Sequence, residues 1–187
     1  MCTNKSSCGS GRTATGACTC GGNGGEQGGT LFRIARAADA PVVHRLICEA
    51  ANENALTDTV TATPERLVQH LFGEHSRAEA IVVHAHGQAL GFAVWHPTFS
   101  SLTGTTGAYL ETLYIRPPFR QKGVGQALLQ TVAQRVLEQG CERLEWQTLK
   151  WNQPALAFYG ELGAETRAEW IPVRLEAEAL RFLNCSC

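Results

Sequence analysis

This chain of 187 residues lacks long apolar runs, and it lacks an excess of charge of either sign. No stretch approaches the roughly 18 consecutive apolar residues that a membrane-spanning helix needs. The formal net charge of −1 argues against binding to nucleic acid through bulk electrostatics. The first residues also show no charged segment followed by an apolar one, so no export signal is expected. We therefore expect a soluble, cytoplasmic protein without a membrane or nucleic-acid partner.

Cysteine is nearly absent from the middle of the chain. Only Cys48 and Cys141 lie between the four cysteines of the first 20 residues and the two at the opposite end. That distribution excludes a small disulfide-stapled scaffold. Two Cys-x-Cys pairs, at positions 18 and 20 and at positions 185 and 187, leave open a soft-metal or redox site if the two ends meet. Exposed thiols in a flexible tail are the simpler interpretation. The histidines show no metal-ligand spacing, and we expect no resident metal.

The first 29 residues lack Leu, Ile, Val and every aromatic residue, while they hold nine of the 19 glycines. Such a segment cannot bury enough apolar surface to offset the entropy lost on ordering. We therefore expect residues 1–29 to be a disordered tail rich in glycine and cysteine, and residues 30–187 to form one domain. Without the tail, 14 basic and 16 acidic residues remain, a balance that slightly favours cationic substrates.

Apolar periodicity outside the tail predicts alternating strands and helices. The first helix should begin at Asp39, as an N-cap with Pro41 in the first turn, and end near Asn52. A second, short helix should begin at Pro64 and end near Gly73. Further strands are expected from Leu31 and at 80–85, 89–98, 108–115, 143–149 and 173–183, with helices at 124–137 and 154–162. The strands at 80–85 and 89–98 should form a hairpin with its turn at residues 86–88. This order predicts an α/β fold with a mixed sheet and helices on both faces.

Residues 120–125, Arg-Gln-Lys-Gly-Val-Gly, lie between the strand expected at 108–115 and the helix expected at 124–137. Glycines let backbone N–H groups turn inward, and a helix N-terminus adds partial positive charge, so residues 121–125 can form a cradle that binds a pyrophosphate. A dinucleotide-binding fold would place a third glycine where Leu128 stands, and a phosphate-binding Walker loop would continue with Gly-Lys-Ser/Thr. Neither pattern is present. The structural alternative is an ordinary glycine loop before an amphipathic helix.

Two motifs in this order resemble the acyl-CoA-binding motifs of the GNAT N-acetyltransferases. They are Arg120-x-x-Gly123-x-Gly125 and Trp151-Asn152-x-Pro154 followed by Phe158-Tyr159. The segments Phe72-Gly73-Glu74-His75 and Leu110-Glu111 look most like the diamine acetyltransferase branch, of the spermidine/spermine or thialysine type. The resemblance runs from about Phe32 to Leu183. It implies a mixed, mainly antiparallel twisted sheet, acetyl-CoA as co-substrate without a metal, a small-molecule amine as acceptor, and a homodimer.

Two residues have side chains suited to acyl transfer. Tyr159 carries a phenol that can protonate or hydrogen-bond a leaving thiolate, and the resemblance gives the matching tyrosine this general-acid role. Glu111 shares an expected apolar strand face with Tyr109, Leu113 and Ile115, where desolvation would raise the pKa of its carboxyl group. It is therefore our candidate base, directly or through a water. The structural alternatives are a packed tyrosine and a salt-bridged strand carboxylate.

The cradle and the resemblance together assign a larger set of positions to acetyl-CoA. These positions are Leu113, Tyr114, Ile115, Arg120, Gln121, Lys122, Gly123, Val124, Gly125, Asn152, Phe158 and Tyr159. Asn152 is equally suited to capping the helix that follows it.

The acceptor amine is the least determined part of the function. Glu111, Asp58, Glu169 and Trp170 are the candidate contacts, and Glu53 is a further possible partner. Asp58, Glu53 and Glu169 have a simpler interpretation as solvated surface charges. Thr112 stands where the eukaryotic diamine enzymes resembled carry a second acid. A thialysine-like amino acid or a short diamine is therefore at least as suitable as spermidine. Two alternatives remain open: acetylation of a protein or peptide amine, and an acyl-CoA-binding module without turnover that carries a metal- or redox-active cysteine tail.

Overall fold

The computed structural model describes residues 25–27 and 29–184, and it divides the chain into two compact units between Trp146 and Gln147. Residues 25–27, inside the expected disordered tail, form a short strand, so ordered structure begins before Thr30. Residues 1–24 and 28 of the tail, and both Cys-x-Cys pairs, lie outside the described residues. Our prediction of one domain over residues 30–187 stays a prediction.

The first unit contains a six-stranded sheet whose strand order follows the chain, β1-β2-β3-β4-β5-β6. The strands are β1 (Gly25–Gln27), β2 (Thr30–Ile34), β3 (Glu79–Ala85), β4 (Gln88–Ser100), β5 (Thr105–Ile115) and β6 (Leu144–Trp146). All neighbours pair antiparallel except β5 and β6, which run parallel. The expected mixed, mainly antiparallel sheet is confirmed.

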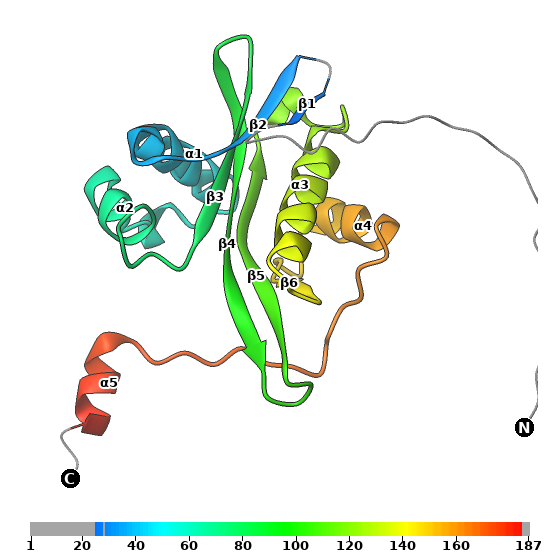
Figure 1. Cartoon of the computed structure of the whole chain (residues 1–187). Helices are drawn as coiled ribbons and strands as arrows, with labels where there is room; N and C mark the ends of the chain where they lie inside the picture. Colours follow the sequence, from blue (N-terminus) through cyan, green and yellow to red (C-terminus); the bar gives the residue numbers. More distant parts are fainter. Residues whose placement is uncertain (1–24, 28, 185–187) are drawn as a thin grey trace, which may run out of the picture. The chain divides into compact units, whose positions relative to one another are not determined.

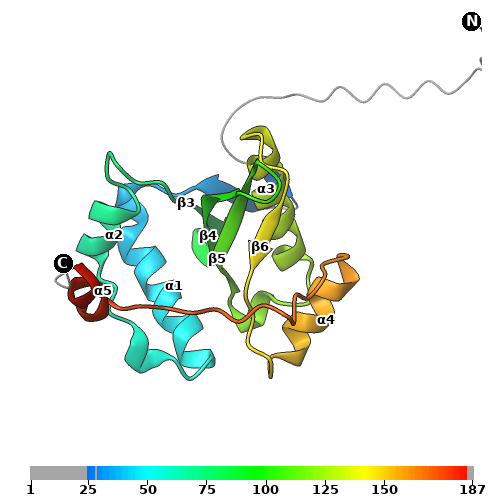
Figure 2. The ribbon, with the colours of Figure 1, turned by 90° about the horizontal axis from the view of Figure 1, so that it is seen from below.

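Helices cover both faces of this sheet, as expected. The helical elements of the first unit are η1 (Ala37–Asp39), α1 (Ala40–Glu53), η2 (Thr57–Thr59), α2 (Pro64–His70), η3 (Pro117–Phe119) and α3 (Val124–Glu138). Figures 1 and 2 show α1 and α2 on one face and α3 on the other. This three-layer packing follows from strand alternation, which sends apolar side chains to both faces of the central strands.

The core on the α1 side shows this alternation directly. Val82 pairs with Phe92, which pairs with Tyr114, and these three side chains pack in one cluster with Val43 and Leu46 of α1. On the other face, α3 contributes a stripe of buried apolar side chains. The stripe consists of Ala127, Leu128, Leu129, Val132 and Val136. Both sides of the middle of the sheet are therefore buried, which makes it a rigid support for the loop after β5.

The hairpin between β3 and β4 confirms the turn expected at residues 86–88. His86 and Gly87 both have positive φ, 49° and 75°, which is typical of a type I′ two-residue turn. This turn has the twist of its flanking strands, so the hairpin forms from local sequence alone.

The second unit contains α4 (Gln153–Glu161) and α5 (Ala177–Asn184). The expected final strand at 173–183 is wrong, because its second half forms α5. Residues 177–183 read Ala-Glu-Ala-Leu-Arg-Phe-Leu, which are mostly strong helix formers. The strand expected at 143–149 is shorter than expected, since β6 ends at Trp146.

Asp39 occupies the N-cap of α1, but its carboxylate makes no capping bond there. Instead, both oxygens accept hydrogen bonds from the Arg33 guanidinium at 2.6 and 2.7 Å, and one also accepts from the Arg36 backbone N–H at 2.8 Å. The pairing with Arg33 lowers the pKa of Asp39, and burial opposes the shift. The residue therefore fastens β2 to the start of α1.

Replacing Asp39 by Asn should lower the free energy of unfolding at pH 7 by about 1–3 kcal/mol, because a charge-assisted pair with little solvent exposure is lost. The lowered pKa means that this stabilisation is present above the ordinary value of 3.8 and is lost as pH falls through the folded-state value. Urea unfolding at a series of pH values measures the difference, which should shrink below about pH 4. Glu176→Gln, which removes an exposed pair with Arg174, is the control. A difference that stays constant down to pH 3 would contradict the assignment.

Candidate functional site

A β-bulge interrupts β5 at Glu111. Val94 of β4 pairs with Thr112, but the next residue, Trp95, pairs with Leu110. Glu111 is therefore an extra residue in β5 without a partner of its own in β4. A bulge of this kind bends the strand and redirects side chains, and bulges are frequent beside active sites.

The bulge changes which side chains share a face. Tyr109 pairs with His96, which lies on the same face of β4 as Val94 and therefore on the same face as Thr112. The expected row of Tyr109 with Leu113 and Ile115 is wrong, since alternation restarts at the bulge. Glu111 itself is exposed, so in the free chain its carboxylate does not have the desolvated, apolar surroundings expected for it.

Beyond the bulge, the edge of β5 that faces β6 is open. The parallel pairing runs only from Ala108–Leu144 to Leu110–Trp146. Within the described part of the chain, no strand pairs with residues 111–115 on that side. An open strand edge presents backbone N–H and C=O groups, which an extended ligand with amide groups can bind as a further strand would.

This open edge leads to the N-terminus of α3. The chain passes from Ile115 through η3 to Gly123, which has a φ of 77° and makes no side-chain capping bond to the helix. Gln121 also has a positive φ, 58°. Alternation between left- and right-handed conformations turns successive N–H groups inward, and the first N–H groups of a helix have no intrahelical partner. The segment lies between a strand and a helix, as expected, and its role as a phosphate cradle stays a prediction.

The two glycines of the cradle have different reasons to be glycine. Gly123 needs its left-handed backbone, which a side chain would strain. Gly125 has no such requirement, and an added Cβ would meet only Ile115 Cγ1 at 3.8 Å, an ordinary contact. The protein's own packing does not require glycine at 125. Close approach by a ligand does explain it.

Two arginines near the cradle are held by carboxylates of α1. Arg116 makes a bidentate pair with Glu49 at 2.6 and 2.7 Å, and Arg120 donates to Glu53 at 2.5 Å. Lys122 donates to the Pro118 carbonyl at 2.9 Å. Neither pair is expected from the sequence, in which Glu49 has no predicted role and Glu53 is a possible contact of the amine. Glu49 and Glu53 stand one helical turn apart, which predicts that they share a face of the helix. Their arginine partners lie 67 residues further along the chain, so the sequence does not indicate the pairs.

Tyr114 belongs to the same network through its side chain, although we predicted it as a backbone contact. Its hydroxyl donates to Glu53 at 2.8 Å. Burial, followed by the bond to Glu53, raises the pKa of Tyr114 to about 12. Tyr114 therefore stays protonated at neutral pH and acts here as a structural donor.

The second unit holds the other predicted cofactor residues. Tyr159 is half-buried in α4, with its ring centroid 5.3 Å from that of Phe158, and burial raises the pKa of its hydroxyl above the ordinary value of 10.0. Asn152 caps α4, where its Oδ1 accepts from the Ala155 N–H at 3.3 Å. The capping interpretation of Asn152 is confirmed, and this role occupies only one of its side-chain groups.

The predicted acceptor contacts are all exposed and are divided between the units. Asp58 lies in η2 of the first unit, while Glu169 and Trp170 belong to the second. In the first unit, Glu111 has an aromatic neighbour, Tyr109. Burial raises the pKa of Tyr109, and the negative charge of Glu111 raises it further. The ring of Tyr109 lies 5.5 Å from that of His96.

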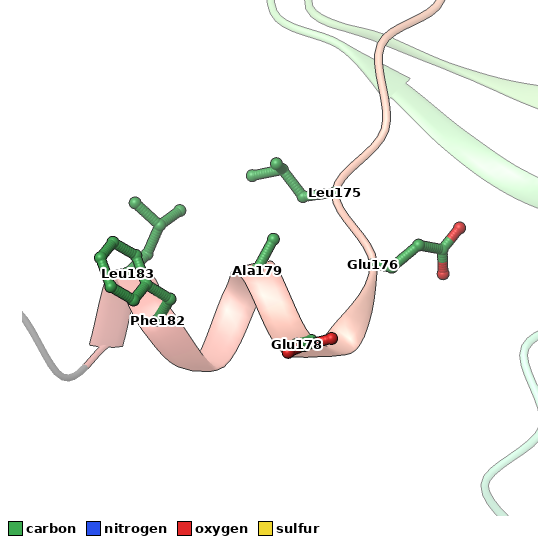
Figure 3. Close-up of a pocket in the computed structure, with 6 residues that line it drawn as sticks. All are labelled: Leu175, Glu176, Glu178, Ala179, Phe182 and Leu183. Atoms are coloured by element: carbon green, nitrogen blue, oxygen red, sulfur yellow. The ribbon is translucent and has the colours of Figure 1, made fainter.

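None of the predicted site residues lines either of two shallow hollows, one in each unit. A shallow hollow of about 610 Å³ lies beside α5, where Leu175, Ala179 and Leu183 point to one side (Figure 3). A smaller one of about 330 Å³ is lined by Glu79, Cys141 and neighbours in the first unit. An extended ligand bound along a strand edge needs no deep cavity, so we place the site at the bulge and cradle. Over residues 25–27 and 29–184, no three His, Cys, Asp or Glu side chains are grouped to hold a metal ion, and no helix there is long and apolar enough to cross a membrane.

Comparison with known proteins gives one family. A model described as the acetyltransferase (GNAT) family matches residues 43–164. The thialysine N-epsilon-acetyltransferase of Sus scrofa is 33% identical over 164 residues, which cover 82% of this chain and 96% of that protein. The L-ornithine N5-acetyltransferase NATA1 of Arabidopsis thaliana is 36% identical over 94 residues, which cover 50% of this chain and 41% of that protein.

Solved structures show the same fold at lower identity. An integron cassette protein from the mobile metagenome of V. cholerae matches with a TM-score of 0.68 and 23% identity, over 84% of this chain and 99% of that one. An aminoglycoside acetyltransferase from an uncultured soil sample, in complex with sisomicin, matches with a TM-score of 0.67 and 18% identity, over 79% and 97% of the two chains.

Proposed function

The chain belongs to the acetyltransferase (GNAT) family, most like its diamine and thialysine branch, and on that premise we propose that it transfers the acetyl group of acetyl-CoA to a primary amine of a small molecule in a ternary complex. Membership in the family supports the enzyme over an acyl-CoA-binding module without turnover. No cysteine lies in the two motifs, so a covalent acyl-enzyme has no obvious nucleophile.

The open edge of β5 next to the α3 cradle is the observation that carries this proposal. Residues 111–115 offer backbone groups to the amide-containing pantetheine arm, and the N-terminus of α3 offers N–H groups to the pyrophosphate. Acetyl-CoA supplies an activated acetyl group as a thioester. The two ends of the site therefore fit the two chemically distinct ends of the same molecule.

In this mechanism, Glu111 receives a proton from the incoming ammonium, directly or through a water, so that the amine nitrogen can attack. A C–N bond then forms at the thioester carbon, the C–S bond breaks, and Tyr159 donates its proton to the departing sulfur. The new amide nitrogen loses its second proton to water, and water reprotonates Tyr159. The raised pKa of Tyr159 keeps that proton available at neutral pH. Because Glu111 is exposed in the free chain, we propose that bound substrate supplies its desolvation.

We propose a thialysine-like amino acid or a short diamine as the acceptor rather than a long polyamine. Full-length relatives that are 33% identical are named for thialysine, and a partial match is named for ornithine. Thr112 next to Glu111 provides no second carboxylate at the bulge. Asp58, Glu169 and Trp170 remain proposed contacts. Homodimer formation and a cytoplasmic location also remain predictions.

A panel of acceptors with acetyl-CoA tests the function. We expect kcat/KM to be highest for thialysine, ornithine or putrescine and lower for spermidine, for an aminoglycoside and for a peptide N-terminus. Acetylated product should be measured by mass spectrometry, because the chain's eight cysteines would react in a thiol-release assay. Preference for the peptide would favour a protein acetyltransferase, and tight CoA binding without any product would favour a binding module.

Replacing Gly125 by Leu should raise KM for acetyl-CoA at least tenfold and leave the melting temperature nearly unchanged. The backbone of Gly125 tolerates a side chain, whereas the pyrophosphate would meet it at the helix terminus. Steady-state kinetics and thermal unfolding measure the two effects. Gln130→Leu, on the exposed side of α3, is the control. A normal KM in Gly125→Leu would place the pyrophosphate elsewhere.

A further inference from the structure

Glu53, the last residue of α1, contacts two parts of the proposed cofactor site. One of its carboxylate oxygens accepts from the Tyr114 hydroxyl at 2.8 Å, and the other accepts from the Arg120 guanidinium at 2.5 Å. Tyr114 lies on β5 beside the open edge, and Arg120 lies in the loop that leads to the cradle. A single side chain therefore joins α1 to the strand and to the loop.

Arg120 is fixed by more than this one bond. Its Nε donates to the Ile115 carbonyl at 2.6 Å, and its guanidinium lies 5.5 Å from the centre of the Tyr114 ring. A guanidinium has five N–H donors in a rigid plane, so these two bonds orient the group without using all its donors. The Arg120 side chain also remains 43% exposed, and it lies three residues before the helix N-cap.

The neighbouring pair on α1 provides a contrast. Arg116 is only 20% exposed, and it makes a bidentate pair with Glu49 and a further bond to the Ala89 carbonyl at 2.7 Å. That arrangement directs the guanidinium into the protein and joins α1 to β4. The pair of Arg120 with Glu53 instead holds an accessible cation in one orientation.

We propose that Glu53 is a positioning residue, which holds Arg120 in the orientation that meets the pyrophosphate of acetyl-CoA. This inference rests on the proposed function. A long, flexible arginine loses rotamer entropy when it binds a phosphate, and an existing bond to Glu53 means that part of this cost is met before the ligand arrives. The negative charge of Glu53 also repels an anionic ligand, but at a partly exposed site that repulsion is screened, so orientation dominates.

Replacing Glu53 by Gln tests this role. We expect KM for acetyl-CoA to rise about fivefold to tenfold and kcat to change less than about twofold, because Glu53 acts on binding rather than on the reacting atoms. S-acetylpantetheine, which lacks the pyrophosphate, separates positioning from general damage: its kcat/KM should be the same in Glu53→Gln and in the unmodified protein. Glu49→Gln is the matched control, with a lower melting temperature and an unchanged KM for acetyl-CoA.

A double-mutant cycle with Arg120→Ala completes the test. If Glu53 acts through Arg120, adding Glu53→Gln to Arg120→Ala changes KM no further. Additive effects, or equal losses with acetyl-CoA and S-acetylpantetheine, would overturn the positioning role. An unmodified protein that acetylates no amine would instead overturn the proposed function, so the two failures are distinguishable.

Discussion

Replacing Tyr159 by Phe should lower kcat by about 100-fold or more, with Kd for CoA changed less than about twofold. Only the hydroxyl is removed, and the ring that packs against Phe158 remains. Without the phenol, the departing sulfur has to leave as an unassisted thiolate. Turnover by mass spectrometry and CoA binding by calorimetry measure the two quantities. Equal turnover in both proteins would remove the general-acid assignment.

The pH profile provides a second test of Tyr159. Burial raises the pKa of this hydroxyl above 10.0, so the protonated form that donates to sulfur persists through neutral and mildly alkaline pH. In the unmodified protein, we therefore expect no loss of kcat from this group below about pH 10, and a loss only as pH rises through its raised pKa. Phe158→Leu, which leaves the hydroxyl in place, is the control for packing. Its kcat should exceed that of Tyr159→Phe by at least about tenfold.

Replacing Glu111 by Gln should lower kcat/KM for the amine on the order of 100-fold, while KM for acetyl-CoA changes little. Glutamine keeps the size and polarity of the side chain, but it cannot accept the ammonium proton or balance its charge. Because Glu111 is exposed on the bulge, the substitution should leave the melting temperature within about 1 °C. Steady-state kinetics with the best acceptor of the panel, followed by thermal unfolding, measure these effects.

The kinetic constants distinguish a base from a simple charge contact. If Glu111 takes the proton, kcat of Glu111→Gln should fall at neutral pH and recover at high pH, where more of the amine is already neutral. If it only binds the ammonium, kcat should stay near that of the unmodified protein and the loss should appear in KM for the amine. Glu142→Gln, another exposed glutamate of the first unit, should behave as the unmodified protein does. Full activity of Glu111→Gln at neutral pH would eliminate Glu111 as the base.

Structural features that depend only on residues close together in the sequence were predictable. The turn at His86-Gly87 and the helix after Gly123 follow from residue types within a few positions, and both form as expected. The final strand was not predictable in this way. Residues 171–176 alternate apolar with other residues as a strand does, but the residues that follow have high helix propensity, and the two signals overlap inside the expected range.

The candidate site was predictable in its residue types and not in its geometry. The glycines predicted the turn into the helix at the cradle. The contacts of Glu53 with Tyr114 and Arg120 were not predictable, because they join residues more than 60 positions apart. The bulge at Glu111 has no local signature, because one extra residue in a strand is visible only against its partner. For that reason strand alternation placed Glu111 in a buried row, whereas its side chain is exposed.

The bulge also has a consequence for protein engineering. Positions on the α1 side of β5 are odd-numbered before Glu111, as at Tyr109, and even-numbered after it, as at Thr112 and Tyr114. A mutant library that randomises every second residue along the whole strand would therefore alter both faces and damage the core. A library meant to change amine selectivity should switch parity at Glu111, and it should neither delete nor insert a residue there, since either change would turn half of the strand over.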